Sequence, residues 1–416
     1  MTPTTADVDL IEAARRVVVT RNGEECVLGR PDHGTYVVVP EPGALFVEAL
    51  QAGSSAAEAT RRASEAAGTE VDGEDFLAGL VQAGLLDPPA GVMGNNAGGA
   101  SAVRPRAREI RWLEGVHPES AKRLFGPVAW VGYGMAATTV FAILAVRDDL
   151  RPSYEHVWWL PDPVLSVLVL IPLGLVLAAA HEAWHWLAGR AAGVPAIFRV
   201  SYRGFFLVFE TDLSQLVTAP RRARYGPYLA GMALDITIVA VALCLRLAHR
   251  SGLVVLPGWL DRLLAAAVLI LLVGVVWQWA ALFMRSDGYA VLANVLRCHD
   301  LYRATWLTTK YRIWVLSNEE STELAGISSH DRRVASWFGL LYLVGLFGMA
   351  WLLLAFSLPF MIGLIGWIGQ NIVNPSLGSL AFWESVAVVI VVVGQYVAVL
   401  LLAWRERRLR RAGALR

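Results

Sequence analysis

Cysteine is scarce in this chain. Its 416 residues include three cysteines, Cys26, Cys244 and Cys298, and no two of them have C-x-x-C spacing. A disulfide framework needs several cysteines at regular spacings, and a thiolate zinc site needs closely paired ones. The sequence therefore indicates neither.

Charge is sparse as well. Only 17% of the residues are charged whereas 56% are hydrophobic, and the mean hydropathy is +0.50. This apolar excess is larger than a soluble core requires, and it predicts a polytopic α-helical membrane protein in contact with the lipid bilayer. The first residues are polar and acidic and lack the pattern of a secretory signal, so we expect a cytoplasmic N-terminus. We expect no nucleic acid among the partners, and nothing in the sequence predicts an oligomeric state.

Residues 1–90 have the pattern of a small soluble α+β domain. Short β-type runs, separated by turn sequences such as Asn22-Gly23 and 31–34, precede helical patterns with Ser54 or Ser55 as one N-cap. The predicted strands are 16–20, 25–29 and 35–39, and the predicted helices are 42–51, 55–67 and 72–83. A three-stranded sheet followed by three helices is a winged-helix-like arrangement, although a generic α+β domain has the same pattern.

This domain resembles the PqqD-like family, the leader-peptide recognition elements of pathways that make natural products from ribosomal peptides. The resemblance lies in the stretches 27–31, 34–38 and 81–86. It implies that a peptide binds by adding to an edge of the sheet as an extra strand.

A flexible linker is predicted at 91–109, because this stretch is rich in Gly, Asn, Ala and Ser and then becomes basic. The membrane domain is predicted at 110–416, and its first part, 110–124, has the mixed apolar and basic composition of an interfacial segment.

Six apolar stretches of the membrane domain are each long enough to cross a bilayer. They are 126–146, 163–189, 226–248, 260–284, 335–356 and 382–404. A further apolar stretch, 358–372, contains Pro359 and several glycines, which leaves a continuation, a re-entrant segment and a seventh crossing as alternatives. Arg and Lys concentrate in alternate loops and in the C-terminal tail, so six crossings with both termini in the cytoplasm satisfy the positive-inside rule. We expect the bilayer to be a bacterial cytoplasmic membrane.

The second predicted span ends in the motif His181-Glu182-Ala183-Trp184-His185. Histidines four residues apart lie on one face of a helix, so both imidazoles can reach one metal ion. The intervening glutamate is placed to take a proton from a water on that metal, as in H-E-x-x-H zinc hydrolases. Counting back from Arg190 at about 1.5 Å per residue puts the pair roughly 7 to 14 Å inside the membrane edge. Such a motif can arise by chance, but these residues are costly inside a membrane unless they serve a function, which favours a Zn²⁺ site.

A catalytic zinc ion needs a third protein ligand and one open position. Asp287 follows the fourth predicted span and is expected at the depth of the two histidines, with an ordinary turn at Asp287-Gly288 as the alternative. Asp235 is the competitor, because it lies within the third predicted span and an intramembrane carboxylate is usually functional. We prefer Asp235 as a hydrogen-bonding partner of a ligating histidine, with metal binding and helix packing as the other roles.

The order of these motifs resembles the site-2 protease family of intramembrane zinc metalloproteases, in particular the branch called peptide zinc metalloproteases. The resemblance covers residues 163–306. It implies that His181, His185 and Asp287 bind zinc and that Glu182 is the general base.

The chain departs from this family at four positions. Ala281 and Leu282 stand where the family has Asn and Pro, Ser286 stands where it has Leu, and Trp184 stands where it has Gly. These departures concern the clamping of a substrate more than the binding of metal.

The sequence therefore predicts an intramembrane zinc endopeptidase that cleaves a membrane-associated or leader-bearing peptide. A hairpin is predicted at 196–212, where it either holds an extended substrate or only lies on the membrane surface. The alternative function is a non-catalytic peptide-binding, export or immunity component of a ribosomal peptide natural-product pathway, with a structural or vestigial zinc site. A metal transporter is disfavoured because the polar residues cluster at one depth.

Overall fold

The computed structural model describes residues 5–22, 25–30, 35–87, 118–194, 196–203, 206–298 and 300–411. The predicted linker at 91–109, the predicted turn at 31–34, Gly23 and most of the interfacial segment lie outside these ranges.

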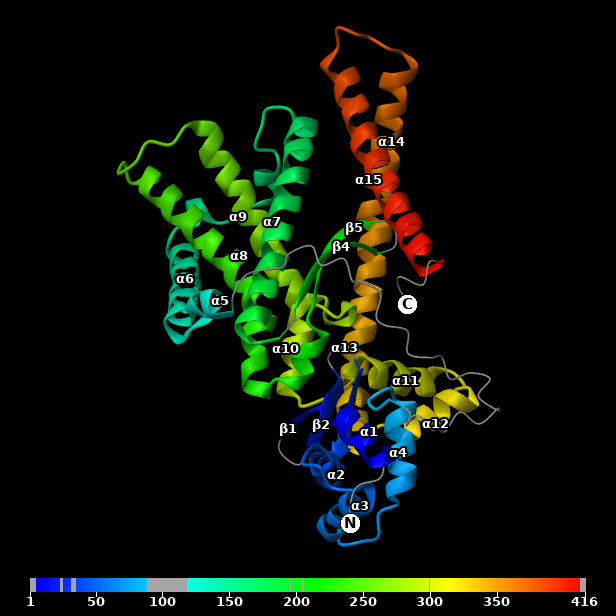
Figure 1. Cartoon of the computed structure of the whole chain (residues 1–416). Helices are drawn as coiled ribbons and strands as arrows, with labels where there is room; N and C mark the ends of the chain where they lie inside the picture. Colours follow the sequence, from blue (N-terminus) through cyan, green and yellow to red (C-terminus); the bar gives the residue numbers. More distant parts are fainter. Residues whose placement is uncertain are drawn as a thin grey trace.

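The described part of the N-terminal domain has an antiparallel sheet of strand order β1-β2-β3, followed by helices (Figure 1). The elements are α1 (Thr5–Ala14), β1 (Val18–Asn22), β2 (Glu25–Arg30), β3 (Thr35–Pro40), α2 (Glu41–Gln51), α3 (Ala56–Ala67) and α4 (Gly73–Gln82). All the predicted strands and helices are present, and Ser55 caps α3 by accepting a hydrogen bond from Glu58 N at 3.4 Å. Helix α1 was not predicted.

The two faces of this sheet have different partners. Leu28 and Val39 point into the core of the domain, where they pack with Phe46 of α2. Side chains alternate between the faces of a strand, so Val27 and Gly29 point to the opposite face. Both are nevertheless buried, because the 3-10 helix η3 (Ser214–Thr218) of the membrane domain lies against β1 and β2.

Six helical segments in the described part of the chain are long and apolar enough to cross a membrane. They are Glu119–Val146, Pro163–Ala191, Arg221–Arg250, Gly258–Ala280, Ser329–Ala355 and Leu380–Arg405. These segments match the six predicted spans. Large apolar side chains on their outer faces, such as Val128 and Phe141, are exposed, as expected for contact with lipid.

The corresponding helices are α5 (Pro118–Phe125) with α6 (Pro127–Val146), α7 (Pro163–Ala191), α8 (Arg221–Arg250), α9 (Gly258–Ala280), α13 (Ser329–Leu352) and α15 (Leu380–Arg411). Helix α8 is central, since 44% of its most apolar stretch is buried, compared with 28% or less in the other spans. It packs against α6, α7 and α9.

The apolar stretch at 358–372 is a helical continuation. A π-helical turn at Leu353–Ser357 joins α13 to α14 (Leu358–Val373), and α15 returns beside α14 (Figure 1). Pro359 has no N–H to donate to the preceding turn, and a local π-turn accommodates that break without ending the helix.

The fourth span ends at Ala280 and not at Met284 as predicted. A 3-10 turn, η4 (Leu282–Met284), and Arg285 in the left-handed region, with φ of 56°, separate α9 from α10 (Asp287–Val295). Apolar composition alone does not distinguish such a turn from a further turn of α-helix. The remaining elements that bear on the site are α11 (Leu301–Ile313), α12 (Asn318–Gly326) and a hairpin of β4 (Ile197–Arg203) and β5 (Phe206–Asp212).

Candidate metal centre

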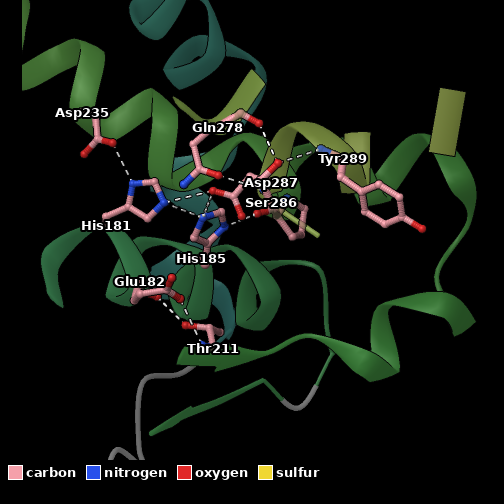
Figure 2. A network of polar contacts seen from close by, with 10 residues as sticks. His181, Glu182, His185, Thr211, Asp235, Gln278, Ser286, Asp287 and Tyr289 are labelled. Carbon is pink, nitrogen blue, oxygen red and sulfur yellow. Dashed lines mark hydrogen bonds and ion pairs between the residues drawn. The ribbon is translucent and has the colours of Figure 1, made fainter. Parts of the chain in front are cut away.

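Three side chains from two helices converge at one point between α7 and α10. His181 and His185 are one turn apart on α7, and Asp287 is the first residue of α10. Asp287 Oδ2 lies 3.0 Å from His181 Nε2 and 3.0 Å from His185 Nε2, and the two Nε2 atoms are 3.1 Å apart. Figure 2 shows the three side chains pointing toward one another.

The other nitrogen of each imidazole is occupied. His181 Nδ1 lies 2.7 Å from Asp235 Oδ2, and His185 Nδ1 lies 2.6 Å from the carbonyl oxygen of Pro227. Both partners are acceptors, so each Nδ1 donates its proton and each Nε2 carries a lone pair. Metal-binding histidines are commonly oriented in this way by a carboxylate or a backbone carbonyl.

The convergent atoms fit a zinc ion. With both Nδ1 atoms protonated, two imidazole lone pairs and a carboxylate oxygen face one another at 3.0 to 3.1 Å, and a cation between them would remove their mutual repulsion. With zinc–nitrogen distances of about 2.0 to 2.1 Å, tetrahedral ligand atoms are separated by about 3.3 Å, close to the spacing observed. A set of two His and one carboxylate is typical of catalytic zinc and leaves a fourth position open.

Close packing of α7 on α8 fixes His181. Gly231 of α8 lies under the imidazole, and a Cβ at this position would come within 2.3 Å of His181 Nε2. Small residues at such contacts allow membrane helices to approach closely. Asp235 lies one turn further along α8, where it reaches His181 from the same side.

The end of α9 positions Asp287. The backbone N–H of Asp287 donates to Gln278 Oε1 at 3.0 Å, and Ser286 Oγ donates to the Gln278 carbonyl at 2.6 Å. Ser286 also caps α10, because it accepts a hydrogen bond from Tyr289 N at 3.3 Å. A Cβ on Gly288 would lie 2.3 Å from the Gln278 carbonyl oxygen, so only glycine allows this approach. Asp287 is thus both the first residue of α10 and a member of the triad.

Gln278 was missed in the sequence, although an amide between Trp277 and Trp279 in an apolar helix was an available signal.

An aromatic cluster holds the first turn of α10 in place. The ring of Tyr289 packs edge-on against Tyr302 and lies close to Phe338, and Arg285 stacks 4.1 Å from the centre of the Tyr302 ring. Burial raises the pKa of the Tyr289 phenol above its usual value, so this side chain stays neutral beside the site.

Strand β5 holds Glu182. Thr211 N donates to Glu182 Oε2 at 3.0 Å, and Thr211 Oγ1 donates to the Glu182 carbonyl at 2.7 Å (Figure 2). The predicted hairpin therefore does lie beside the motif helix. The role of Thr211 was not predicted, because nothing in the local sequence marks a strand residue that contacts a helix 29 positions earlier.

A cavity of about 340 Å³ adjoins the triad. His181 and Glu182 line it at one end together with Asp235 and Gln278, and the rest of its wall is apolar, with Gly174 of α7 and Gly274 of α9 facing the space. A peptide segment with apolar side chains is the kind of ligand that this space can hold.

Trp184 does not line this cavity. Its Nε1 donates to the Tyr133 hydroxyl at 3.1 Å, and its ring packs edge-on against Phe125. The bulky residue at this position of the motif therefore anchors α7 to α5 and α6.

Comparison of the chain with known proteins finds no match among protein-family models, curated proteins or solved structures.

Proposed function

We propose that this protein is an intramembrane zinc endopeptidase of the site-2 protease type. The observation that carries the proposal is the convergence of three lone-pair donors, His181, His185 and Asp287, beside a cavity that Glu182 also lines. Soluble H-E-x-x-H zinc hydrolases assign the same roles: two histidines on a helix and a third residue bind the metal, and the glutamate is the general base.

The residues of the chain then have distinct tasks. A zinc ion held by the triad would act as a Lewis acid on the scissile carbonyl and on the attacking water. Glu182 takes a proton from that water as its oxygen bonds to the carbonyl carbon, and it passes the proton to the leaving nitrogen as the C–N bond breaks. Asp235 holds His181 in the tautomer that exposes Nε2. The products are a carboxylic acid and an amine.

The substrate proposed is a membrane-associated or leader-bearing peptide. The wall of the cavity accepts apolar side chains, and the N-terminal domain, by its resemblance to leader-recognition elements, would bind part of the same peptide. Binding at a docked domain raises the effective concentration of the peptide near the site. The distribution of Arg and Lys supports a cytoplasmic location for both termini, and we propose a bacterial cytoplasmic membrane as the host bilayer.

The test uses detergent-purified protein loaded with Zn²⁺ and a library of apolar peptides with lysine flanks, in water enriched in heavy oxygen. Hydrolysis places one heavy oxygen in each new carboxyl group, which mass spectrometry detects.

Glu182→Gln should lower the rate of hydrolysis by about 10²- to 10⁴-fold, because general acid–base catalysis contributes that much. Glu155→Gln, an exposed glutamate of the loop before α7, should keep the wild-type rate. Equal rates for Glu182→Gln and the wild type would contradict the proposal.

A non-catalytic peptide-binding, export or immunity component is the alternative. It predicts that no peptide is cleaved, that peptide binding survives Glu182→Gln, and that binding is lost only when the N-terminal sheet is altered. The contact of Glu182 with the cavity favours the enzyme, because a binding component has no use for a carboxylate beside three metal ligands.

A further inference from the structure

A second group of metal-ligating side chains lies at the opposite end of α10 from Asp287. Cys298 follows the last turn of α10, and His330 and Asp331 lie in the first turn of α13. One ligand atom from each of these three residues lies within 4.8 Å of the others. Cys298 lies 32 positions before His330 and 33 before Asp331, so the fold and not local sequence brings the cysteine to the other two residues.

Each ligand is positioned by the backbone around it. His330 Nε2 lies 2.8 Å from the Leu296 carbonyl and therefore donates its proton there, which leaves the lone pair on Nδ1. The same arrangement orients histidines in established metal sites. Asp331 is buried, at 5% exposure, and its backbone N–H is held by the N-cap Ser328 at 3.0 Å.

The backbone at Cys298 is unusual. Arg297 has a φ of 58°, and among the non-glycine residues described only it and Arg285 have positive values. This left-handed turn ends α10 and returns Cys298 N to the Ala293 carbonyl at 3.1 Å, the bonding pattern for which glycine is usually selected. Both arginines flank α10, and each stands within two residues of a candidate ligand, Asp287 or Cys298.

We propose that Cys298, His330 and Asp331 bind a second Zn²⁺ ion, separate from the triad on α7. Thiolate, imidazole and carboxylate together suit zinc, a borderline-soft cation, better than calcium or magnesium. Three protein ligands leave a fourth position, and because His330 is exposed, water can fill it.

A cation bound here would link α10 to α13. The cation ties the end of α10 to the start of α13, and α10 carries Asp287 at its other end. Leu292 and Leu296 pack against an apolar cluster that includes Val334 and Phe338 of α13, and the metal bonds would add to this packing. No C-x-x-C pair marks this site in the sequence, because its other two candidate ligands lie more than 30 positions after Cys298.

Cobalt separates this site from the triad, because only a thiolate ligand gives Co²⁺ a charge-transfer absorption in the near ultraviolet. The experiment titrates metal-free, detergent-purified protein with Co²⁺ alone. We expect the near-ultraviolet band in the wild type, in Cys26→Ser, in Cys244→Ser and in Asp287→Ala, and its loss in Cys298→Ser. The outcome does not depend on peptidase activity or on the triad, so failure of either proposal leaves the other testable.

His330→Ala serves as the second variant, because His330 is exposed and we expect the fold to tolerate its truncation. The affinity of this variant for Co²⁺, measured from the thiolate band, should fall at least about tenfold. Substitution of residues that only orient a metal ligand already lowers metal affinity by about 10- to 100-fold, and loss of a ligand should cost no less. Absence of the band in the wild type, its persistence in Cys298→Ser, or an unchanged affinity in His330→Ala would each overturn the proposal and leave a hydrogen-bonded cluster only.

Discussion

At the scale of single residues, His181 is the most constrained side chain of the site. Its two nitrogens contact Asp235 and Asp287, and Gly231 lies beneath its ring. Asp235 belongs to the third span, so the preference for it as the partner of a ligating histidine agrees with this geometry. An ionised partner strengthens the lone pair on Nε2 and fixes the orientation of the ring.

Asp235→Asn tests that role. The amide has the shape of the carboxylate but no charge, so the affinity for Zn²⁺ at the triad should fall by about 10- to 100-fold. Competition with a chromogenic chelator measures this affinity. The matched control is Thr237→Val, because Thr237 lies two positions along the same helix and, within the described part of the chain, its hydroxyl donates only to the Ala233 carbonyl. An unchanged affinity in Asp235→Asn would show that the contact with His181 is only structural.

The sequence predicted the candidate ligands, the candidate base and one supporting residue, Asp235, and it missed the other residues that position them. His181, Glu182 and His185 follow from helical spacing, and Asp287 follows from its expected depth. Gln278 and Thr211 act through hydrogen bonds between separate elements, so their roles depend on tertiary structure that spacing along the chain does not encode.

At the scale of elements, the site depends on how closely α7 and α8 approach. Gly231 permits this approach, because a methyl group in its place would overlap the imidazole of His181. That imidazole is held from both sides, by Asp235 at Nδ1 and by Asp287 at Nε2.

Gly231→Ala should therefore displace His181 and remove zinc from the triad, with loss of all peptidase activity. Metal analysis of the purified variant measures the loss, and circular dichroism checks that the helices persist. Gly132→Ala in α6 is the control, since no other element among the described residues comes within 4 Å of the added Cβ. Full zinc content in Gly231→Ala would mean that α7 and α8 separate at little cost.

The helices and strands were predicted best where local composition and alternation determine the type of element. The six long apolar runs correspond to six described helices long and apolar enough to span a membrane, and the β-type runs correspond to the strands of both sheets. The continuation of α13 into α14 was left open because Pro359 and the glycines suit a break as well as a π-turn. Helix α1 was missed, and the boundary of α9 was wrong by a 3-10 turn, because both depend on packing and capping.

At the scale of the whole molecule, a series of contacts runs from the N-terminal sheet to Glu182. Thr20 Oγ1 of β1 donates to the Thr218 carbonyl of η3 at 2.7 Å, and η3 directly follows β5. Thr211 in β5 in turn bonds to Glu182. The N-terminal domain, which we propose binds peptide, thus contacts the 3-10 helix that directly follows the strand holding Glu182. This series of contacts is a route for coupling between the domain and the proposed base.

Gly29→Val tests the docking of the two domains. A Cβ on Gly29 would lie 2.9 Å from Thr218 Cγ2 and 2.8 Å from Tyr36 Cδ1, so the larger side chain should push η3 away from the sheet. We expect faster amide hydrogen exchange across 214–218 and slower cleavage of leader-bearing peptides, with zinc content unchanged. Gly79→Val on α4 should alter neither measurement, because no other described element comes within 4 Å of a Cβ at that position. Unchanged exchange in Gly29→Val would exclude this contact.

The assembly of the domains was beyond prediction from the sequence. The apolar pattern of β2 explains its core face. The burial of Val27 and Gly29 on the opposite face depends on η3, whose Thr218 lies 198 positions after its partner Thr20.

The central claim is that a zinc ion binds to His181, His185 and Asp287, and metal content tests it most directly. Wild-type protein and Asp287→Ala are purified in detergent and analysed for zinc per chain, with Asp300→Ala, the N-cap of α11, as the control. The account predicts that Asp287→Ala holds one zinc ion per chain fewer than the wild type and that Asp300→Ala holds the same number. Equal zinc content in Asp287→Ala and the wild type, with the fold intact in both, would contradict it.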